Sequence, residues 1–277
     1  MQYNRNTIVE GRTPKHVIGI MGKAGAGKDT VGEMIRGYIG YDKSIKYSFA
    51  DPLKAMCALV FEIPMVWMYD QDLKTRNVNI STKNPVTIEK MREWVDVNIA
   101  QVDKWNWHIA RPELSGKYEG TRTEQVANAI FSKFDDVVFE KLIPQGLTTR
   151  ITHKVYNISI RTLLQYMGTD VIRELIDNEF WAEIKYPVYK DTTVVSPDCR
   201  FESEVKYIMS QSGSIIIVKN SDLVVDTKHK HESETFVDLV EDYLRQKNYP
   251  FVIIENNLSN NYEITNKQVV NFCERNL

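Results

Sequence analysis

A glycine-rich segment between an apolar run and a helical pattern constrains the fold of this chain most strongly. The segment reads Gly-Lys-Ala-Gly-Ala-Gly-Lys-Asp-Thr at residues 22–30 and follows the apolar run Val17–Met21. After it, apolar residues recur at the spacing of an amphipathic helix. Small side chains let backbone N–H groups point inward, at the positive end of the helix dipole. The sequence therefore predicts a strand, a phosphate-binding loop and a helix.

The residue types of this segment suit a nucleotide triphosphate. Gly22, Gly25 and Gly27 permit the tight backbone path that phosphate binding requires. Gly25, Ala26 and Gly27 are expected to bind the cofactor. Lys28 would reach the β- and γ-phosphates and offset charge that shifts during transfer, and the Thr30 hydroxyl would serve the α-phosphate. We therefore expect this loop to bind ATP, with Lys28 as a catalytic residue. The alternative is a glycine-rich turn that opens an ordinary helix.

Asp29 departs from the most common form of this loop, in which Ser or Thr directly follows the lysine as a ligand of Mg²⁺. Gly-Lys-Asp-Thr at residues 27–30 resembles the nucleoside monophosphate kinase form instead. Mg²⁺ would then be held chiefly by water and phosphate, and we assign no metal-ligand set within the protein. Asp29 is either a partner of water bound to the ion or a first-turn acid favoured by the helix dipole.

Four further apolar runs predict strands of a buried parallel sheet, at Ile45–Phe49, Thr193–Ser196, Ser214–Val218 and Phe251–Ile254. Helical patterns alternate with most of them, which predicts right-handed crossovers and a layered α/β fold. We expect residues 1–60 and 190–277 to form the core, and residues 61–189 to form a mainly helical insertion that binds the acceptor. The Asn-rich segment that begins at Asn256 is interpreted as a surface loop.

Composition and charge exclude several classes of protein. The 35 basic and 37 acidic residues nearly cancel, so we expect no polymeric nucleic acid as a partner. The three cysteines are widely separated, which argues against a disulfide framework or a zinc cluster and fits a reducing cytoplasm. No window approaches the roughly 20 apolar residues of a membrane-spanning helix. We expect a soluble, cytoplasmic protein that binds small molecules. The sequence leaves open whether it forms a homodimer.

Charged residues follow two of the predicted strands, at the edge where ligands of open α/β sheets bind. After the second strand, Asp51 is either a helix cap or a residue that positions the acceptor phosphate or Mg²⁺, and Lys54 is a candidate phosphate contact. After the third, Asp198 is placed as a magnesium-organising acid and Arg200 suits a phosphate. Glu204 lies one helical turn beyond. The alternative for these last residues is a surface ion pair that caps a helix.

A helical pattern in the predicted insertion carries further candidates. Arg161 and Gln165 are four residues apart and share a helix face, where a guanidinium and an amide suit a phosphate and a base edge. Arg173 is either part of this site or a solvated charge. Trp181 either stacks on a nucleobase or fills the core of the insertion.

The segment 228–231 precedes the last long helical pattern, where small P-loop kinases carry a mobile lid. Lys228, Lys230 and His231 would bring positive charge to the transferring phosphoryl group, and a closed lid would exclude water. The alternative is a polar loop that ends in a Ser233 helix cap.

These segments together resemble the deoxynucleoside monophosphate kinases of large bacteriophages, a branch of the P-loop kinases related in fold to adenylate kinase. The resemblance rests on four motifs in order: residues 27–30, Ser-Phe-Ala-Asp-Pro-Leu-Lys at 48–54, the stretch from Arg161 through Gly-Thr-Asp to Arg173 and Trp181, and Asp-Xaa-Arg-Phe-Xaa-Xaa-Glu at 198–204. His-Xaa-Ser-Glu at 231–234 adds to it. It implies a three-layer α/β/α core with sheet order 2-3-1-4-5, and it adds Thr169 to the substrate-binding residues.

The activity that this resemblance implies is ATP- and Mg²⁺-dependent conversion of a deoxynucleoside monophosphate to its diphosphate, for viral DNA synthesis in the host cytoplasm. We expect direct in-line transfer, with Lys28 holding the donor and with Arg200, Arg161 and Lys54 holding the acceptor phosphate. Two alternatives share the phosphate-binding loop. One is a small P-loop kinase such as a dephospho-coenzyme A kinase, and the other is a non-enzymatic module that ATP binding switches.

Overall fold

The computed structural model of the chain describes residues 15–100, 118–142, 154–184, 191–220, 232–256 and 262–277. These residues divide into two compact units, each with a hydrophobic core of its own. Unit 1 contains the described residues of Met1–Phe49 and Lys185–Leu277, and unit 2 contains those of Ala50–Ile184.

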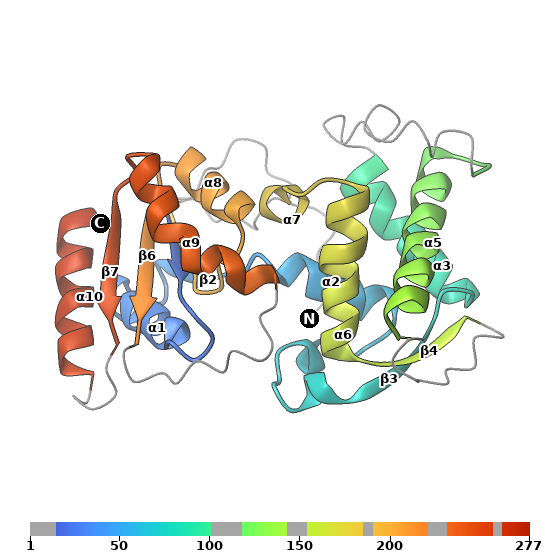
Figure 1. Cartoon of the computed structure of the whole chain (residues 1–277), viewed down its shortest axis with the longest axis horizontal. Helices are drawn as coiled ribbons and strands as arrows, with labels where there is room; N and C mark the ends of the chain where they lie inside the picture. The colour runs from blue at the N-terminus through green and yellow to red at the C-terminus, as the bar shows by residue number, and fades with distance from the viewer. Residues whose placement is uncertain (1–14, 101–117, 143–153, 185–190, 221–231, 257–261) are drawn as a thin grey trace. The chain divides into compact units, whose positions relative to one another are not determined.

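Unit 1 is built on a parallel sheet of five strands (Figure 1). The strands are β1 (His16–Met21), β2 (Ser44–Lys46), β5 (Thr193–Ser196), β6 (Ser214–Lys219) and β7 (Phe251–Glu255). They lie in the order β2-β5-β1-β6-β7, and every neighbouring pair is parallel. Counted in chain order within this sheet, the order is 2-3-1-4-5. The structure therefore confirms the α/β fold class and the parallel sheet expected from the sequence.

The second strand differs from its prediction. We expected Ile45–Phe49, but β2 ends at Lys46. Tyr47 N still donates to Val195 O at 3.0 Å, after which the chain leaves the sheet. Phe49 is fully buried all the same, because its ring packs edge-on against Tyr207 at 6.0 Å between centroids. The apolar residue that lengthened the predicted strand therefore belongs to a buried turn.

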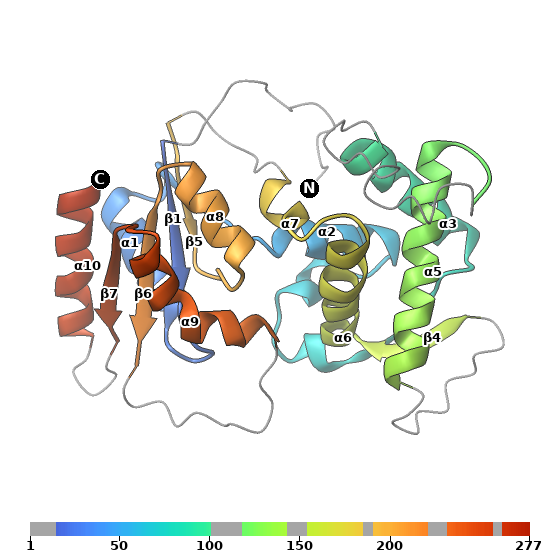
Figure 2. The ribbon, with the colours of Figure 1, turned by 45° about the horizontal axis from the view of Figure 1, so that its top comes forward.

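Helices cover both faces of this sheet (Figures 1 and 2). Ile18 and Ile20 of β1 face a core shared with α1 (Lys28–Ile39) and α10 (Glu263–Asn276). The opposite face carries α8 (Glu202–Ser210) and α9 (Glu232–Gln246). Gly19 points to that face, where an added Cβ would lie only 2.2 Å from Ile208 Cδ1 of α8. The Ile208 side chain of α8 therefore packs directly over Gly19, where a larger residue would collide with it.

Unit 2 is mainly helical. Its α-helices are α2 (Asp51–Val60), α3 (Pro85–Val95), α5 (Arg122–Leu142), α6 (Ile160–Gln165) and α7 (Phe180–Glu183). Short 3-10 helices η1 (Met65–Met68) and η2 (Leu73–Thr75) follow α2, and π-helical segments η3 (Asp96–Ala100) and η7 (Tyr166–Arg173) extend α3 and α6. No helix within the described part of either unit has the length and apolar character that a bilayer crossing requires.

A two-stranded antiparallel sheet, which the sequence analysis did not anticipate, also belongs to unit 2. It pairs β3 (Asn77–Ser81) with β4 (Val155–Ser159). Tyr156 and Ile158 are buried in the core of the unit. Asn157 lies on the exposed face, where its side chain hydrogen-bonds Asn77 at 2.9 Å and Asn79 at 2.7 Å. These bonds tie together two strands that lie far apart in the sequence.

Candidate active site

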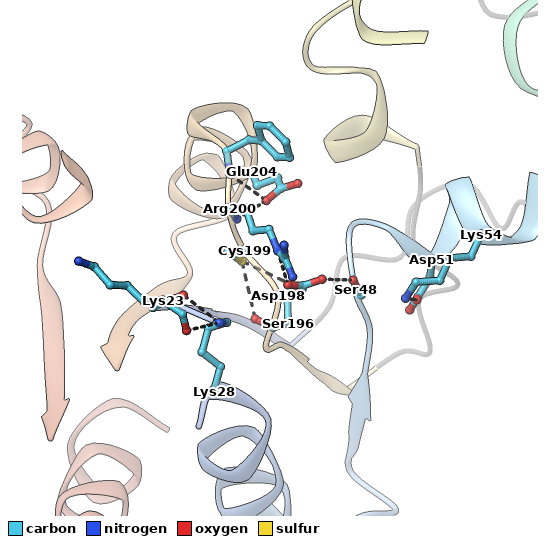
Figure 3. Close-up of polar contacts among 12 residues, drawn as sticks. Lys23, Lys28, Ser48, Asp51, Lys54, Ser196, Asp198, Cys199, Arg200 and Glu204 are labelled. Atoms are coloured by element: carbon cyan, nitrogen blue, oxygen red, sulfur yellow. Dashed lines mark hydrogen bonds and ion pairs between the residues drawn. The ribbon is translucent and has the colours of Figure 1, made fainter. Parts of the chain in front are cut away.

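The predicted phosphate-binding loop joins β1 to α1 in unit 1, and its lysine is held across the loop. Lys28 Nζ donates to Gly22 O at 2.8 Å and to Lys23 O at 2.9 Å (Figure 3). Gly27 precedes the helix with φ 88° and ψ 24°, a left-handed conformation that glycine adopts without strain. The loop therefore places an ammonium group at the start of a helix, where the dipole already favours an anion.

Asn256 is buried behind this loop, so its interpretation as the start of a surface loop is wrong. It is 2% exposed, and its side-chain Nδ2 donates to Ala26 O at 2.8 Å. The interpretation rested on the Asn-rich residues that follow Asn256, of which residues 257–261 lie outside the described residues. Only the end of β7 beside β6 brings Asn256 to the loop, and no short-range pattern reports that pairing.

Asp29 and Thr30 occupy the first turn of α1. The Asp29 carboxylate is exposed and forms an ion pair with Lys46 Nζ at 2.7 Å, and Glu33 lies 3.6 Å from the same ammonium. Burial lowers the pKa of Lys46, but hydrogen bonds and charge from Asp29 and Glu33 outweigh it, so the pKa is raised overall. Asp29 therefore has a basic partner at the end of β2. Thr30 is partly exposed beside it.

Asp198 and Arg200 follow β5, which lies between β1 and β2 in the sheet. Arg200 Nε donates to Asp198 Oδ1 at 2.6 Å, and Ser48 Oγ lies 3.5 Å from Asp198 Oδ2 (Figure 3). Because the carboxyl ends of parallel strands share one edge, this carboxylate and guanidinium lie at the same edge as the Lys28 loop. The sequence analysis gave Ser48 no role of its own, because its contact arises only from the pairing of β2 with β5.

Glu204 faces inward from the first turn of α8. It is 3% exposed, and its Oε2 accepts hydrogen bonds from Arg200 N at 2.7 Å and Phe201 N at 3.2 Å. Its carboxylate thus fixes the backbone that carries Arg200, whose side chain is exposed. Burial, then the charge of Glu204, raises the pKa of the neighbouring Cys199 thiol, which therefore stays protonated.

In unit 2, Asp51 and Lys54 form a compact group with Tyr69. Asp51 Oδ1 accepts from Lys54 Nζ at 2.9 Å and from the Tyr69 hydroxyl at 3.0 Å. The Lys54 ammonium also lies 4.2 Å from the centre of the Tyr69 ring. Asp51 stands in the first turn of α2, before Pro52. Tyr69, which the sequence analysis overlooked, is part of this polar cluster.

The remaining candidates of unit 2 lie on α6, η7 and α7, and the structure separates exposed from buried ones. Arg161 is exposed, and its Nη2 lies 3.4 Å from Gln71 Oε1. Gln165, on the same helix, and Thr169, on η7, are partly exposed. Arg173 is only 8% exposed and donates from Nη1 to Asn178 O at 2.7 Å. It is therefore no solvated surface charge.

Trp181 lies in the core of unit 2. It is 3% exposed, its Nε1 donates to Gly168 O at 2.9 Å, and its ring packs against Phe180 and Trp94 at 5.0 and 6.2 Å between centroids. This burial favours the core role over stacking on a nucleobase, which needs an accessible ring face. The lid candidates Lys228, Lys230 and His231 lie outside the described residues, so the lid stays a prediction.

Comparison with known proteins identifies the family. A search of curated proteins found no match. The sequence model of a protein family described as deoxynucleotide monophosphate kinase matches residues 16–241. The matched region spans most of the chain, from β1 through the loop and the Asp198–Arg200 turn into α9. This favours the deoxynucleotide kinase over the dephospho-coenzyme A kinase and the non-enzymatic ATP module. With its parallel sheet and glycine-rich loop, the chain belongs to the deoxynucleotide monophosphate kinase family and is a phosphotransferase that acts on small molecules.

Proposed function

We propose that the phosphate donor is ATP and that the loop at residues 22–30 holds its triphosphate. The observation that carries this proposal is the position of Lys28, whose ammonium is fixed across the loop at the carboxyl edge of the parallel sheet. Backbone amides at the start of α1 and the helix dipole add to the attraction for an anion. The Asp198 and Arg200 pair follows the adjacent strand β5, within reach of the same sheet edge.

We also propose that Mg²⁺ accompanies the nucleotide. Within the described residues, no group of three or more His, Cys, Asp or Glu side chains is placed to hold a metal ion. Mg²⁺ fits a site with few protein ligands, because it keeps several waters and binds through phosphate oxygens with one or two carboxylates. Asp198 would supply such a carboxylate, and the Thr30 hydroxyl would serve the α-phosphate. When bound, the ion would neutralise phosphate charge; the protein's own contribution is to position the reactants.

The reaction requires no general base in this proposal. The acceptor monophosphate is already an anion at neutral pH, so one of its oxygens can form the bond to the γ-phosphorus directly. The bond between that phosphorus and the β–γ bridging oxygen breaks, and ADP leaves with the electron pair. Lys28 offsets the charge that builds up on the leaving phosphate, and Arg200 holds the acceptor phosphate through its planar guanidinium. Positioning and charge neutralisation thus supply the rate acceleration.

For the acceptor, we propose that unit 2 supplies further ligands. Arg161 suits the acceptor phosphate because it is exposed and its partner, the Gln71 amide, is neutral. Gln165 shares its helix and suits a base edge. Lys54 is the weaker candidate, since Asp51 already offsets its charge. The product diphosphate would serve DNA precursor synthesis, and the resemblance to bacteriophage enzymes supports a viral setting.

The test is ADP release by the purified chain with ATP and Mg²⁺ against a panel of acceptors. The panel contains the four common deoxynucleoside monophosphates, their ribonucleotide counterparts and dephospho-coenzyme A. We expect ADP release with at least one deoxynucleotide and none with dephospho-coenzyme A. Turnover confined to dephospho-coenzyme A, or ATP hydrolysis with no acceptor dependence, would exclude the proposed reaction.

A further inference from the structure

Asn256 links three distant segments of unit 1 through buried hydrogen bonds. It directly follows β7, and its backbone N donates to Lys219 O at 2.7 Å. Its side-chain Nδ2 donates to Ala26 O in the loop at 2.8 Å. On its other side, Thr265 Oγ1 of α10 lies 3.3 Å from Asn256 Oδ1 and 3.1 Å from Glu255 O. Asn256 is 2% exposed and Thr265 1%, so the side-chain bonds from Asn256 to Ala26 and Thr265 are buried.

The bond to Ala26 determines the orientation of one peptide group in the loop. In a planar trans peptide the C=O and the following N–H point in opposite directions. When Asn256 holds the Ala26 carbonyl, it therefore turns the N–H of Gly27 away from β7. Ala26 N is already used, because it donates to Lys23 O at 3.1 Å. The Gly27 amide is thus directed by a residue 229 positions away in sequence, at the end of another strand.

The close approach of Asn256 also explains why position 27 is a glycine. A Cβ on residue 27 would lie 1.9 Å from Asn256 Nδ2, far inside contact distance. The left-handed φ of 88° at Gly27 independently disfavours a side chain. Asn256 and Gly27 therefore fit each other, and a side chain at position 27 would collide with the Asn256 amide.

We propose that Asn256 is a positioning residue for the phosphate-binding loop. Its amide fixes the Ala26–Gly27 peptide so that the Gly27 N–H is available to the phosphates of the donor, and Thr265 keeps the amide in place. This inference rests on the proposed function, since it takes the loop to be the ATP site. Asn256 itself touches no substrate in this account; it acts through the backbone of the loop.

The experiment compares Asn256→Ala and Asn256→Asp with the unaltered protein. Alanine removes the hydrogen bond, and aspartate sets a carboxylate against the Ala26 carbonyl with nearly the same shape. Loss of one buried hydrogen bond corresponds to about a tenfold change in an equilibrium. We expect the Kd for ATP, measured by calorimetry, and the KM for ATP to rise about tenfold or more, with the KM for the deoxynucleotide changed less than about twofold. An ATP affinity within twofold of the unaltered protein in both folded variants would overturn the proposal.

Two controls separate positioning from general loss of stability. Val269→Ala leaves a cavity in the same core, on α10, and removes no hydrogen bond to the loop. Asn276→Ala removes another amide that donates to a backbone carbonyl, that of Phe272 at 2.8 Å, from the exposed end of α10. We expect normal ATP affinity in both. If Val269→Ala weakens ATP binding as much as Asn256→Ala at the same fall in unfolding temperature, the effect is general and the proposal fails.

A third variant and a reference keep the result interpretable. If the Asn256 variants do not fold, Thr265→Val tests the same chain of bonds, and we expect the ATP Kd to rise about two- to fivefold; an unchanged Kd would then count against the proposal. Thr265→Ser, which keeps the hydroxyl, should restore affinity. Lys28→Ala is the reference. If the unaltered protein does not bind ATP, or Lys28→Ala binds it normally, the proposed function fails; if both behave as expected and the Asn256 variants bind normally, the inference alone fails.

Discussion

The phosphate-binding loop of unit 1 and the polar cluster of unit 2 hold their cationic side chains in different ways. Lys28 donates to main-chain carbonyls of its own loop. These acceptors remain whatever side chains Gly22 and Lys23 are replaced by. Lys54 and Arg161 instead contact side chains, those of Asp51 and Gln71. A loop fixed through its backbone suits a donor that is the same in every reaction cycle. Side-chain contacts can exchange for a ligand, which suits the proposed role of unit 2 in binding the acceptor.

The comparison predicts that a change in the loop affects every acceptor alike. Lys28→Ala should lower kcat by about a thousandfold or more, because one preorganised charge facing the transferred phosphoryl group is lost. The loss should be equal for all deoxynucleotides that the enzyme accepts. Steady-state ADP release with each acceptor measures it, and circular dichroism reports whether the variant is folded.

Lys206→Ala is the matched control, since this lysine of α8 is exposed and pairs with Glu202 at 2.9 Å. Its kcat should stay near normal. Near-normal turnover of Lys28→Ala would remove the donor role from the loop.

Arg200 tests whether the donor and acceptor roles divide along the two units. It lies in unit 1, yet we assign it to the acceptor phosphate. Arg200→Ala should raise the KM for the deoxynucleotide and lower kcat/KM by about ten- to a hundredfold, as loss of a charge-assisted hydrogen bond predicts. The KM for ATP should change little. Arg245→Ala, which removes an exposed arginine paired with Glu241, serves as control; equal kinetics of the two variants would take Arg200 out of the site.

Trp181 tests whether a buried residue of unit 2 supports stability or acceptor choice. Trp181→Phe removes the donor to Gly168 O and leaves that carbonyl buried without its partner. We expect unfolding free energy to fall by about 1–3 kcal/mol in chemical denaturation. The relative kcat/KM values for the four deoxynucleotides should be unchanged, since the ring is buried. A shift in base preference without a loss of stability would instead support stacking on the nucleobase.

Arg161 tests whether unit 2 discriminates between acceptors. Arg161→Ala should lower kcat/KM by about three- to tenfold, less than at Arg200 because exposed charges are screened by solvent. The ATP KM should be unchanged. Arg92→Ala offers a match in the same unit, an arginine whose Nη1 lies 3.4 Å from Glu124. A defect of equal size in both variants would assign the effect to net charge.

The smallest expected effect concerns His16, at the far end of β1 from the loop. Its Nε2 lies 2.9 Å from Ser214 Oγ of β6, and burial, then the charge of Lys15, lowers its pKa. The folded state therefore favours the neutral ring. Stability is complete above the ordinary histidine pKa of about 6.5 and falls as the pH drops toward the lower folded value. Urea unfolding at pH 7.5 and 5.5 should show a smaller loss in His16→Gln; equal losses would contradict this sign.

Much of the core of unit 1 could be predicted because its signals are local. Four of the five strands are continuous apolar runs that lie within a residue or two of their predicted ends, and the loop is defined by consecutive residues. The antiparallel pair of unit 2 was missed because Asn77–Ser81 and Val155–Ser159 alternate polar and apolar residues, as a half-buried strand does. A search for apolar runs overlooks that pattern.

The site was harder to predict where a contact joins segments distant in sequence. Adjacent residues gave Asp198 and Arg200, which do lie together. Other contacts depend on strand order, as for Asn256 and Ser48, or join Tyr69 to the start of α2, 18 residues earlier. Nothing in the polarity of these three residues singled them out in the sequence. Burial of two charged residues was also invisible, since Glu204 and Arg173 are buried, whereas the sequence offered a core position as one alternative for Trp181.

The contact of Gly19 with α8 makes a distant part of β1 matter for catalysis. A larger residue at position 19 would collide with the Ile208 side chain and press against Cys199, next to the backbone of Arg200 that Glu204 secures. A genetic screen for inactive enzymes would consequently recover substitutions of Gly19, although we assign this glycine no contact with ATP or with the deoxynucleotide. Directed evolution of acceptor choice would do well to leave it untouched and to vary the exposed positions of α6.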